Sequence, residues 1–178
     1  MNDAISIRPY RSEDIDGLYE AVRESMRELL PWMPWCHPEY ARAETVAWVE
    51  ARPTAWETKT EFAFAIESES GLFLGGCGLN RIEHENGTAN LGYWVRTSAV
   101  GRGVATRAAE LLREWAFANT ELHRLEIVSA VGNTASQRVA EKIGATREGT
   151  LRQRLVVRGQ RYDAVLYSIL RSPSACSI

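Results

Sequence analysis

The segment that decides the fold is residues 91–115, LGYWVRTSAVGRGVATRAAELLREW. Leu91, Tyr93 and Val95 occupy every second position, which is the period of a strand. From Val104 onward the apolar residues recur at helical spacing, and charged residues occupy the rest of the helical wheel. A glycine-rich turn, residues 97–103, separates the two periods. The segment therefore predicts a strand, a turn and a long helix in direct succession.

The end of this turn and the start of the helix, residues 100–106, form what we call the glycine loop. Backbone N–H groups at the start of a helix have no partner within the helix, and the helix dipole adds partial positive charge there. Such a place binds anions, phosphate in particular. Arg96, Arg102 and Arg107 lie in or beside the loop, with no acidic residue between them. The loop therefore predicts a multiply charged phosphate ligand.

Three kinds of phosphate ligand can be compared by spacing. A Walker-type loop requires Gly-x-x-x-x-Gly-Lys-Ser/Thr, which the sequence lacks. A dinucleotide fingerprint requires Gly-x-Gly-x-x-Gly, and here Thr106 stands in place of the third glycine. Glu121 and Glu126 fall where that fingerprint expects an acidic residue, but acidic residues are common. The third kind is coenzyme A, and a nucleotide-binding domain of the dinucleotide type remains an alternative.

The glycine loop resembles motif A of the GNAT superfamily of N-acetyltransferases, whose pattern is Gln/Arg-x-x-Gly-x-Gly/Ala. Val100 replaces the usual Gln or Arg at its first position. Further segments are similar to the Rim-type branch, which modifies the N-termini of ribosomal proteins, and they keep the order of that branch. These segments are residues 30–35, 91–95, 133–145 and 148–152.

The resemblance implies an α/β (α+β) fold with a mixed, mostly antiparallel central sheet and helices on both faces. It implies one N-acetyltransferase domain over residues 1–171 and a tail over residues 172–178. The patterns predict strands at residues 5–9, 62–66, 72–82, 88–95 and 125–129, a hairpin across 150–170 that turns at 158–160, and helices at 12–30, 39–52, 104–119 and from 133. Ser12 is the expected N-cap of the first helix, and Pro53 is expected to end the second.

The resemblance also implies where acetyl-CoA, the cosubstrate, binds. The backbone N–H of Val95 would polarise the thioester carbonyl, and the N–H groups of the glycine loop would bind the pyrophosphate. The expected cofactor-binding residues are Trp94, Val95, Val100, Gly101, Arg102, Gly103, Val104, Ala105, Thr106, Asn133 and Ser136.

Asn133 and Ser136 share a helix face, since they are three residues apart. Asn133 is also the expected N-cap of its helix. Many relatives protonate the leaving thiolate with a Tyr seven residues after the Asn, where this chain has Ala140. The ribosomal branch uses a Ser three residues after the Asn. The resemblance therefore assigns Ser136 as proton donor or hydrogen-bond partner of the thiolate.

The residues that would bind the amine acceptor of the acetyl group have weaker sequence signals. Trp32 and Trp35 lie in a proline-interrupted segment, where they either cover the edge of the core or line an acceptor pocket. The position of the family's catalytic Glu is Leu155, which cannot take a proton. Three alternatives remain: water accepts the proton from a partly neutral amine, His84 or Glu83 serves as base, or the protein binds acetyl-CoA without efficient catalysis.

Composition narrows the classes further. The chain has 178 residues, a net charge of −2 and three cysteines with no metal-binding spacing, so we expect no metal and no nucleic-acid partner. No apolar run approaches a membrane span, which predicts a cytoplasmic protein. The resemblance implies a monomer or a homodimer. The predicted activity is direct transfer of acetyl to a primary amine, either a protein N-terminus or a small aminoacyl compound. The alternative is a catalytically weak acyl-CoA-binding module.

Overall fold

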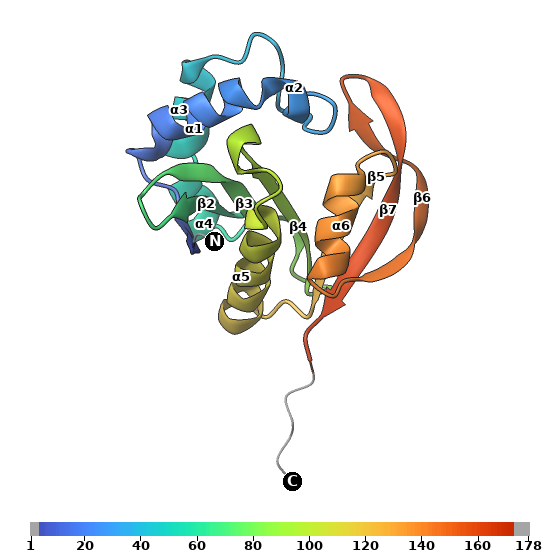
Figure 1. Cartoon of the computed structure of the whole chain (residues 1–178). Coiled ribbons are helices and arrows are strands. Elements are labelled where there is room, and N and C mark those ends of the chain that lie inside the picture. The colour runs from blue at the N-terminus through green and yellow to red at the C-terminus, as the bar shows by residue number, and fades with distance from the viewer. Residues whose placement is uncertain (1–3, 173–178) are drawn as a thin grey trace.

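The computed structural model describes residues 4–172, which form a seven-stranded sheet with helices on both faces (Figure 1). The strands are β1 (Ile5–Pro9), β2 (Phe62–Ser68), β3 (Phe73–Glu83), β4 (Thr88–Val95), β5 (Arg124–Ala130), β6 (Thr146–Val157) and β7 (Gln160–Leu170). The helices are α1 (Asp14–Glu24), α2 (Met26–Leu29), α3 (Arg42–Glu50), α4 (Arg52–Glu57), α5 (Val104–Asn119) and α6 (Thr134–Lys142), with a 3-10 turn η1 (Thr97–Ala99). The expected fold class is confirmed. The proposed tail, apart from its first residue, lies outside the described residues.

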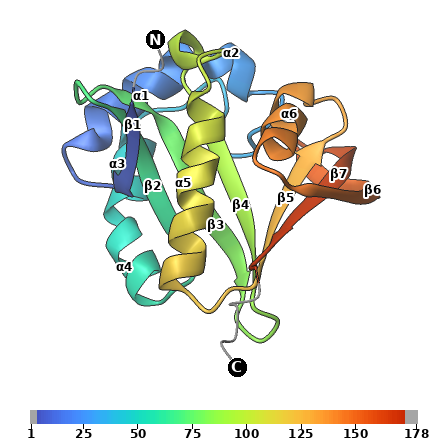
Figure 2. The same cartoon turned by 60° about the horizontal axis from the view of Figure 1, so that its bottom comes forward.

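The strands follow the order β1-β2-β3-β4-β5-β7-β6. All neighbours are antiparallel except β4 and β5, which pair in parallel across the α5 crossover, as the strand–helix–strand pattern predicts. The parallel ladder is short and joins residues 88–90 of β4 to residues 124–126 of β5. Beyond that ladder the two strands diverge, which Figure 2 shows clearly.

Two apolar clusters hold the helices to opposite faces of the sheet. One cluster buries α5 and α6 against residues such as Leu79, Leu91 and Leu125. The other buries α1 and α3 against residues that include Ala65 and Phe73. Phe64 and Ile66 of β2 belong to the first cluster, while Ala65 between them belongs to the second, because successive strand residues point to opposite faces.

Glycines inside a strand often mark a place where another backbone comes close. In β3, Gly75 is such a place, because the end of β4 lies against it. Gly75 has a φ of +153°, and a Cβ added there would lie 2.2 Å from the carbonyl oxygen of Trp94 on β4. The register of β2 and β3 also shifts beside this position, after Ile66. Gly75 therefore sets how closely the end of β4 approaches β3.

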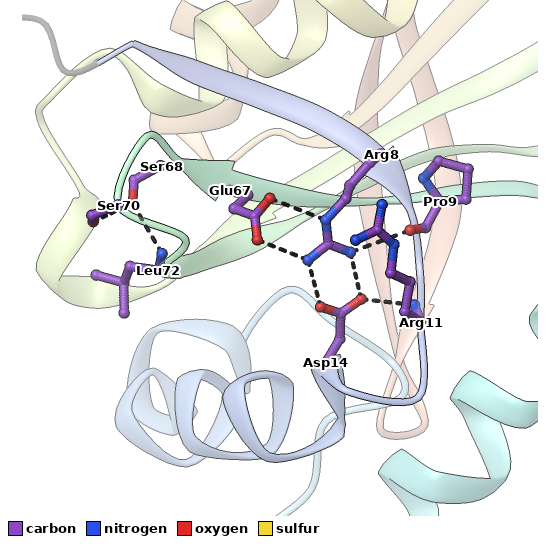
Figure 3. A network of polar contacts seen from close by, with 8 residues as sticks. All are labelled: Arg8, Pro9, Arg11, Asp14, Glu67, Ser68, Ser70 and Leu72. Atoms are coloured by element: carbon purple, nitrogen blue, oxygen red, sulfur yellow. Dashed lines mark hydrogen bonds and ion pairs between the residues drawn. The ribbon is translucent and has the colours of Figure 1, made fainter.

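A charged network fixes the corner between β1 and α1 (Figure 3). Arg8 donates two hydrogen bonds of 2.7 Å to Asp14, and two of 3.0 and 2.9 Å to Glu67 of β2. Burial alone would raise the pKa of Asp14, but the hydrogen bonds from Arg8 and from the backbone of Arg11 outweigh it and lower that pKa. The network holds the corner of the chain at which Tyr10 lies.

The first helix differs from its prediction at both ends. Ser12 is not the N-cap, because α1 begins at Asp14 after Glu13, which makes no side-chain cap. The carboxylate of Asp14 instead accepts a hydrogen bond from the backbone of Arg11 (2.8 Å). The helix also does not continue to residue 30. It breaks at Ser25, whose hydroxyl oxygen accepts a hydrogen bond from the N–H of Thr97 (2.9 Å).

Two other boundaries also differ. Pro53 does not end a helix but lies in the first turn of α4, where its missing N–H costs no helical hydrogen bond. The last hairpin begins at Thr146 rather than at residue 150, with a register shift between Arg147 and Gly149. Its turn, at Arg158 and Gly159, lies where the sequence predicts it.

Candidate functional site

A cavity of about 520 Å³ lies where β4 and β5 diverge, within the range of small-molecule sites. It is lined by residues 90–94 of β4, residues 127–130 of β5, and Asn133 and Ser136 at the start of α6. Aromatic side chains from the N-terminal third close one side, and Leu155 and Val157 of β6 contribute to the lining. The cavity therefore connects elements from both faces of the sheet.

The end of β4 directs one backbone donor into the opening. The N–H of Arg96 donates to the carbonyl oxygen of Leu74, on the β3 side, at 2.8 Å. Since successive N–H groups of a strand point to opposite edges, the N–H of Val95 points to the β5 edge. The ladder to β5 has already ended at Asn90. The geometry leaves the Val95 donor facing the opening, and its role toward a thioester stays a prediction.

The glycine loop has the backbone conformation that its sequence requires. Gly101 and Gly103 have φ values of +81° and +80°, and an added Cβ at either would meet no atom within 4 Å. Gly103 caps α5, and its carbonyl oxygen accepts from the N–H of Arg107 (3.0 Å). The N–H groups of residues 104–106 precede that bond and have no helical partner. With no acidic residue in the first turn of α5, the loop fits a pyrophosphate.

The junction of α1 and α2 holds the residues that lead into the glycine loop. The Nε of Arg96 donates to Glu24 (2.9 Å), and the other carboxylate oxygen of Glu24 accepts from the N–H of Ser98 (2.8 Å). The hydrogen bond from Arg96 is the main reason that the pKa of Glu24 is lowered to about 2. Together with the bond from Thr97 to Ser25, these contacts fix the chain between β4 and the loop.

At the start of α6, Asn133 is the N-cap, and its side-chain oxygen accepts from the N–H of Ser136 (3.1 Å). The hydroxyl of Tyr93 on β4 donates to the carbonyl oxygen of Ser136 (2.9 Å) and lies 3.2 Å from its Oγ. Burial raises the pKa of Tyr93 to about 12. Ala140, where relatives have a Tyr, is fully buried. A phenol therefore reaches this site from a strand instead of from α6.

Sequence reasoning did not identify Tyr93 as a site residue. Strand alternation indicates only that Tyr93 shares a face with Leu91. No local pattern connects Tyr93 with Ser136, which lies 43 residues further along the chain. The contact arises because β4 and α6 are brought together by the fold.

Six aromatic side chains line the N-terminal side of the cavity and form what we call the aromatic wall. They are Tyr10, Trp32, Trp35, Tyr40, Trp48 and Trp94. Trp35 is 41% exposed, and its ring centroid lies 5.9 Å from that of Trp94 and 6.0 Å from that of Tyr40. Trp32 and Trp35 both line the cavity, and their role toward an acceptor stays a prediction. Trp94, expected to contact the cofactor, contributes its ring to the same wall.

The structure does not bring the two candidate bases to the cavity. His84 and Glu83 are exposed at the β3–β4 turn, and neither is among the lining residues. Leu155 does line the cavity, so an apolar side chain stands where relatives have a carboxylate. Cys77 also lines it, but burial raises the pKa of its thiol well above the usual range, so the thiol stays protonated.

Cys36 and Cys77 are buried free thiols, and Cys176 lies outside the described residues. Within residues 4–172, no helix is long and apolar enough to cross a membrane. The same residues contain no group of three or more His, Cys, Asp or Glu side chains placed to hold a metal ion.

Comparison with known proteins adds to this geometry. A family model described as an acetyltransferase (GNAT) domain matches residues 5–146. The chain is 31% identical over 176 residues to the "Putative ribosomal N-acetyltransferase YdaF" of Bacillus subtilis (strain 168), covering 96% of this chain and 93% of that protein. It is 26% identical to the ribosomal-protein-serine acetyltransferase of Escherichia coli (strain K12), covering 94% of this chain and 93% of that protein. Mycobacterium smegmatis RimJ in complex with CoA-disulfide superposes with a TM-score of 0.85 and 26% identity, covering 95% of this chain and 83% of that one.

Proposed function

The chain belongs to the GNAT family of N-acetyltransferases, and on that premise we propose that it transfers acetyl from acetyl-CoA to the α-amino group of a protein N-terminus or a small aminoacyl compound. Ribosomal-protein N-termini are candidate acceptors, because two relatives are named for ribosomal N-acetylation. The observation that supports the proposal is the cavity between β4 and β5. Its lining joins the aromatic wall to Asn133 and Ser136 at the start of α6, while the glycine loop lies outside this lining at the start of α5.

Acetyl-CoA supplies an acetyl group already activated as a thioester. The N–H groups of residues 104–106, which have no partner within the helix, would bind its pyrophosphate, and the positive φ of Gly101 and Gly103 shapes the turn before them. The N–H of Val95 would donate to the thioester carbonyl oxygen, where negative charge develops during attack. These roles use backbone groups, so they tolerate Val100 in place of the usual Gln or Arg.

In the transfer step the amine nitrogen forms a C–N bond, the C–S bond breaks, and the sulfur leaves as a thiolate. Ser136 would give its hydroxyl proton, or a hydrogen bond, to that sulfur. With a pKa of about 12, Tyr93 remains protonated at neutral pH; its O–H donates to the carbonyl oxygen of Ser136, and its oxygen lies 3.2 Å from the Oγ of Ser136. We therefore assign Tyr93 as the residue that positions the hydroxyl of Ser136.

The ammonium form of the acceptor loses one proton before attack, and its nitrogen loses a second proton as the amide forms. The apolar side chain of Leu155 lines the cavity where the resemblance implies a catalytic carboxylate. Apolar surroundings lower the pKa of an ammonium group, because they desolvate its charge. An α-amino group, with an ordinary pKa near 8, is then sufficiently neutral for water to carry the proton away. Cys77 is held as a thiol, so transfer is direct, without an acyl-enzyme.

Amine-dependent release of thiol from acetyl-CoA tests the proposal. A panel of N-terminal peptides and small amines should give acetylated product, confirmed by mass spectrometry, with a stoichiometric thiol signal. Calorimetry with CoA, and with NAD as the control nucleotide, should show binding of CoA alone. Tight CoA binding with no amine-dependent thiol release would support the acyl-CoA-binding alternative. A folded protein with no affinity for CoA at millimolar concentration would contradict both.

A further inference from the structure

We infer that the acceptor is a primary amine with an aromatic ring on or next to the amino-bearing carbon, and that Trp35 and Trp94 hold this ring. An N-terminal Phe, Tyr or Trp and a free arylalkylamine share this chemistry. The inference rests on the proposed function and specifies its acceptor.

The aromatic wall provides the ring contacts. Trp35 lies at interplanar angles of 60° to Trp94 and 59° to Tyr40, at centroid distances of 5.9 and 6.0 Å. Deeper in the wall, Tyr10 meets Trp48 edge to face at 4.7 Å. Aromatic rings pair at centroid distances of about 4.5–7 Å in offset or edge-to-face arrangements. An incoming ring beside the exposed Trp35 would extend a series of such pairs.

The floor of the cavity leaves space for a flat group. Gly76 pairs with Trp94, and Gly78 pairs with Gly92, in the register of β3 and β4. Because side chains alternate along a strand, Gly92 is on the same face as Trp94. A Cβ added at Gly92 would lie 3.8 Å from the nearest atoms, the side-chain nitrogens of two asparagines. The floor is therefore open at Gly92 but not at Gly76, where an added Cβ would lie 2.4 Å from the hydroxyl of Tyr10.

The charges on the lining argue against a polycationic acceptor. Among residues 4–172, the charged side chains that line the cavity are Glu44, Glu61 and Arg81. Glu44 already pairs with His37 (2.8 Å), and Glu61 pairs with Arg52 (2.5 Å). Both carboxylates therefore already have a partner, and Arg81 carries the same sign of charge as a polyamine. The wall therefore suits a ring rather than a cation.

Initial rates with matched peptides test the inference. Tetrapeptides that differ only in the first residue, Phe, Ser or Asp, are compared with phenethylamine and spermidine at saturating acetyl-CoA. We expect kcat/KM for the Phe peptide to exceed that for the Ser peptide by tenfold or more. The Asp peptide and spermidine should be the poorest acceptors. The rate with phenethylamine shows whether a free arylalkylamine or a peptide is the better source of the ring.

Variants show whether the wall is responsible. Trp35→Ala should reduce the Phe-to-Ser preference to less than threefold, while Trp35→Phe should retain most of it. Gly92→Val should lower the rate with the Phe peptide more than the rate with the Ser peptide, since its methyl groups would occupy the open floor. Leu170→Ala removes an apolar side chain that is 61% exposed and does not line the cavity, and it should change neither rate. Circular dichroism and thermal unfolding confirm that each variant is folded.

Equal or better turnover of the Ser peptide, or of spermidine, would overturn the inference and leave the acetyltransferase proposal standing. A preference for Phe that survives both Trp35→Ala and Gly92→Val would overturn the assignment to this wall. Binding of acetyl-CoA without acetylation of any ring-bearing amine would also overturn the inference. Absence of CoA binding by folded protein would contradict the proposed function itself, and the inference with it.

Discussion

The aromatic wall lines the cavity and the glycine loop lies outside its lining, and the two regions are built in opposite ways. The loop is a single stretch of seven consecutive residues, 100–106, that offers backbone N–H groups. The wall gathers side chains from the end of β1, the α2–α3 segment, α3 and β4. Side-chain changes in the loop therefore matter mainly where they alter the backbone, whereas each ring of the wall lines the cavity directly. On the proposed function, acceptor specificity would change without disturbing the phosphate site.

The largest expected effect comes from straining the loop backbone. Val cannot adopt the φ of +81° found at Gly101 without a cost of roughly 1–2 kcal/mol or more. We expect Gly101→Val to weaken CoA binding about 100-fold, measured by calorimetry, because the N–H groups turn away. Gly159→Val is the matched control, with a φ of +78° and open space in the last hairpin. Equal loss of affinity in both variants would contradict the assignment to the loop.

The next effect separates a side-chain role from the backbone roles beside it. We expect Ser136→Ala to lower kcat tenfold or more with little change in the KM for acetyl-CoA, because the leaving sulfur loses its donor. Thr134→Ala removes an exposed hydroxyl from the same helix and should leave kcat unchanged. Steady-state thiol release measures both. Unchanged turnover in Ser136→Ala would remove this residue from the mechanism.

A smaller effect tests how the amine loses its proton. If water accepts it, the acidic limb of the kcat/KM profile should follow the pKa of each acceptor tried. Leu155→Glu places a carboxylate in the cavity lining. It should raise the rate about fivefold when the pH is one unit below the pKa of the acceptor. Leu155→Gln, of similar size, should not. If the acidic limb of the wild-type kcat/KM profile has the same midpoint pH for acceptors of different pKa, a group of the protein takes the proton.

The smallest effect concerns the contact that holds the chain leading into the glycine loop. With its pKa lowered to about 2, Glu24 stabilises the folded state above about pH 4.5, and this contribution is lost as pH falls toward 2. Glu24→Gln should therefore lower the stability by about 1 kcal/mol, or about 2–4 °C in Tm, at pH 7. The difference from wild type should shrink on acidification below pH 4.5. Glu20→Gln, exposed on the same helix, is the control; a pH-independent difference would exclude the ion pair.

The features that the sequence predicts correctly are those determined by residues close together in the chain. The change of period at Val104 and the two glycines before it define α5, which runs to Asn119 as expected. Asn133 is recognisable as a cap because capping involves residues within one turn. In these segments, propensity and tertiary structure agree.

The parts that sequence missed depend on distant partners. The break at Ser25 is accompanied by a hydrogen bond from Thr97, which lies 72 residues away. His84 was a reasonable base by chemistry, but the β3–β4 turn places it outside the cavity lining. Tyr93 approaches Ser136 only once β4 and α6 are packed. No periodicity or motif carries such information, and the catalytic and binding roles stay predictions.

The short ladder between β4 and β5 has a consequence for turnover. A gap made by the parting of two strands of one sheet needs no hinge between domains. On the proposed function, acetyl-CoA and the amine would approach this gap from opposite faces of the sheet, and each product would leave by the route of its precursor. The acetylated product and free CoA would then leave independently of each other. Their relative affinities for the protein would set the order of release.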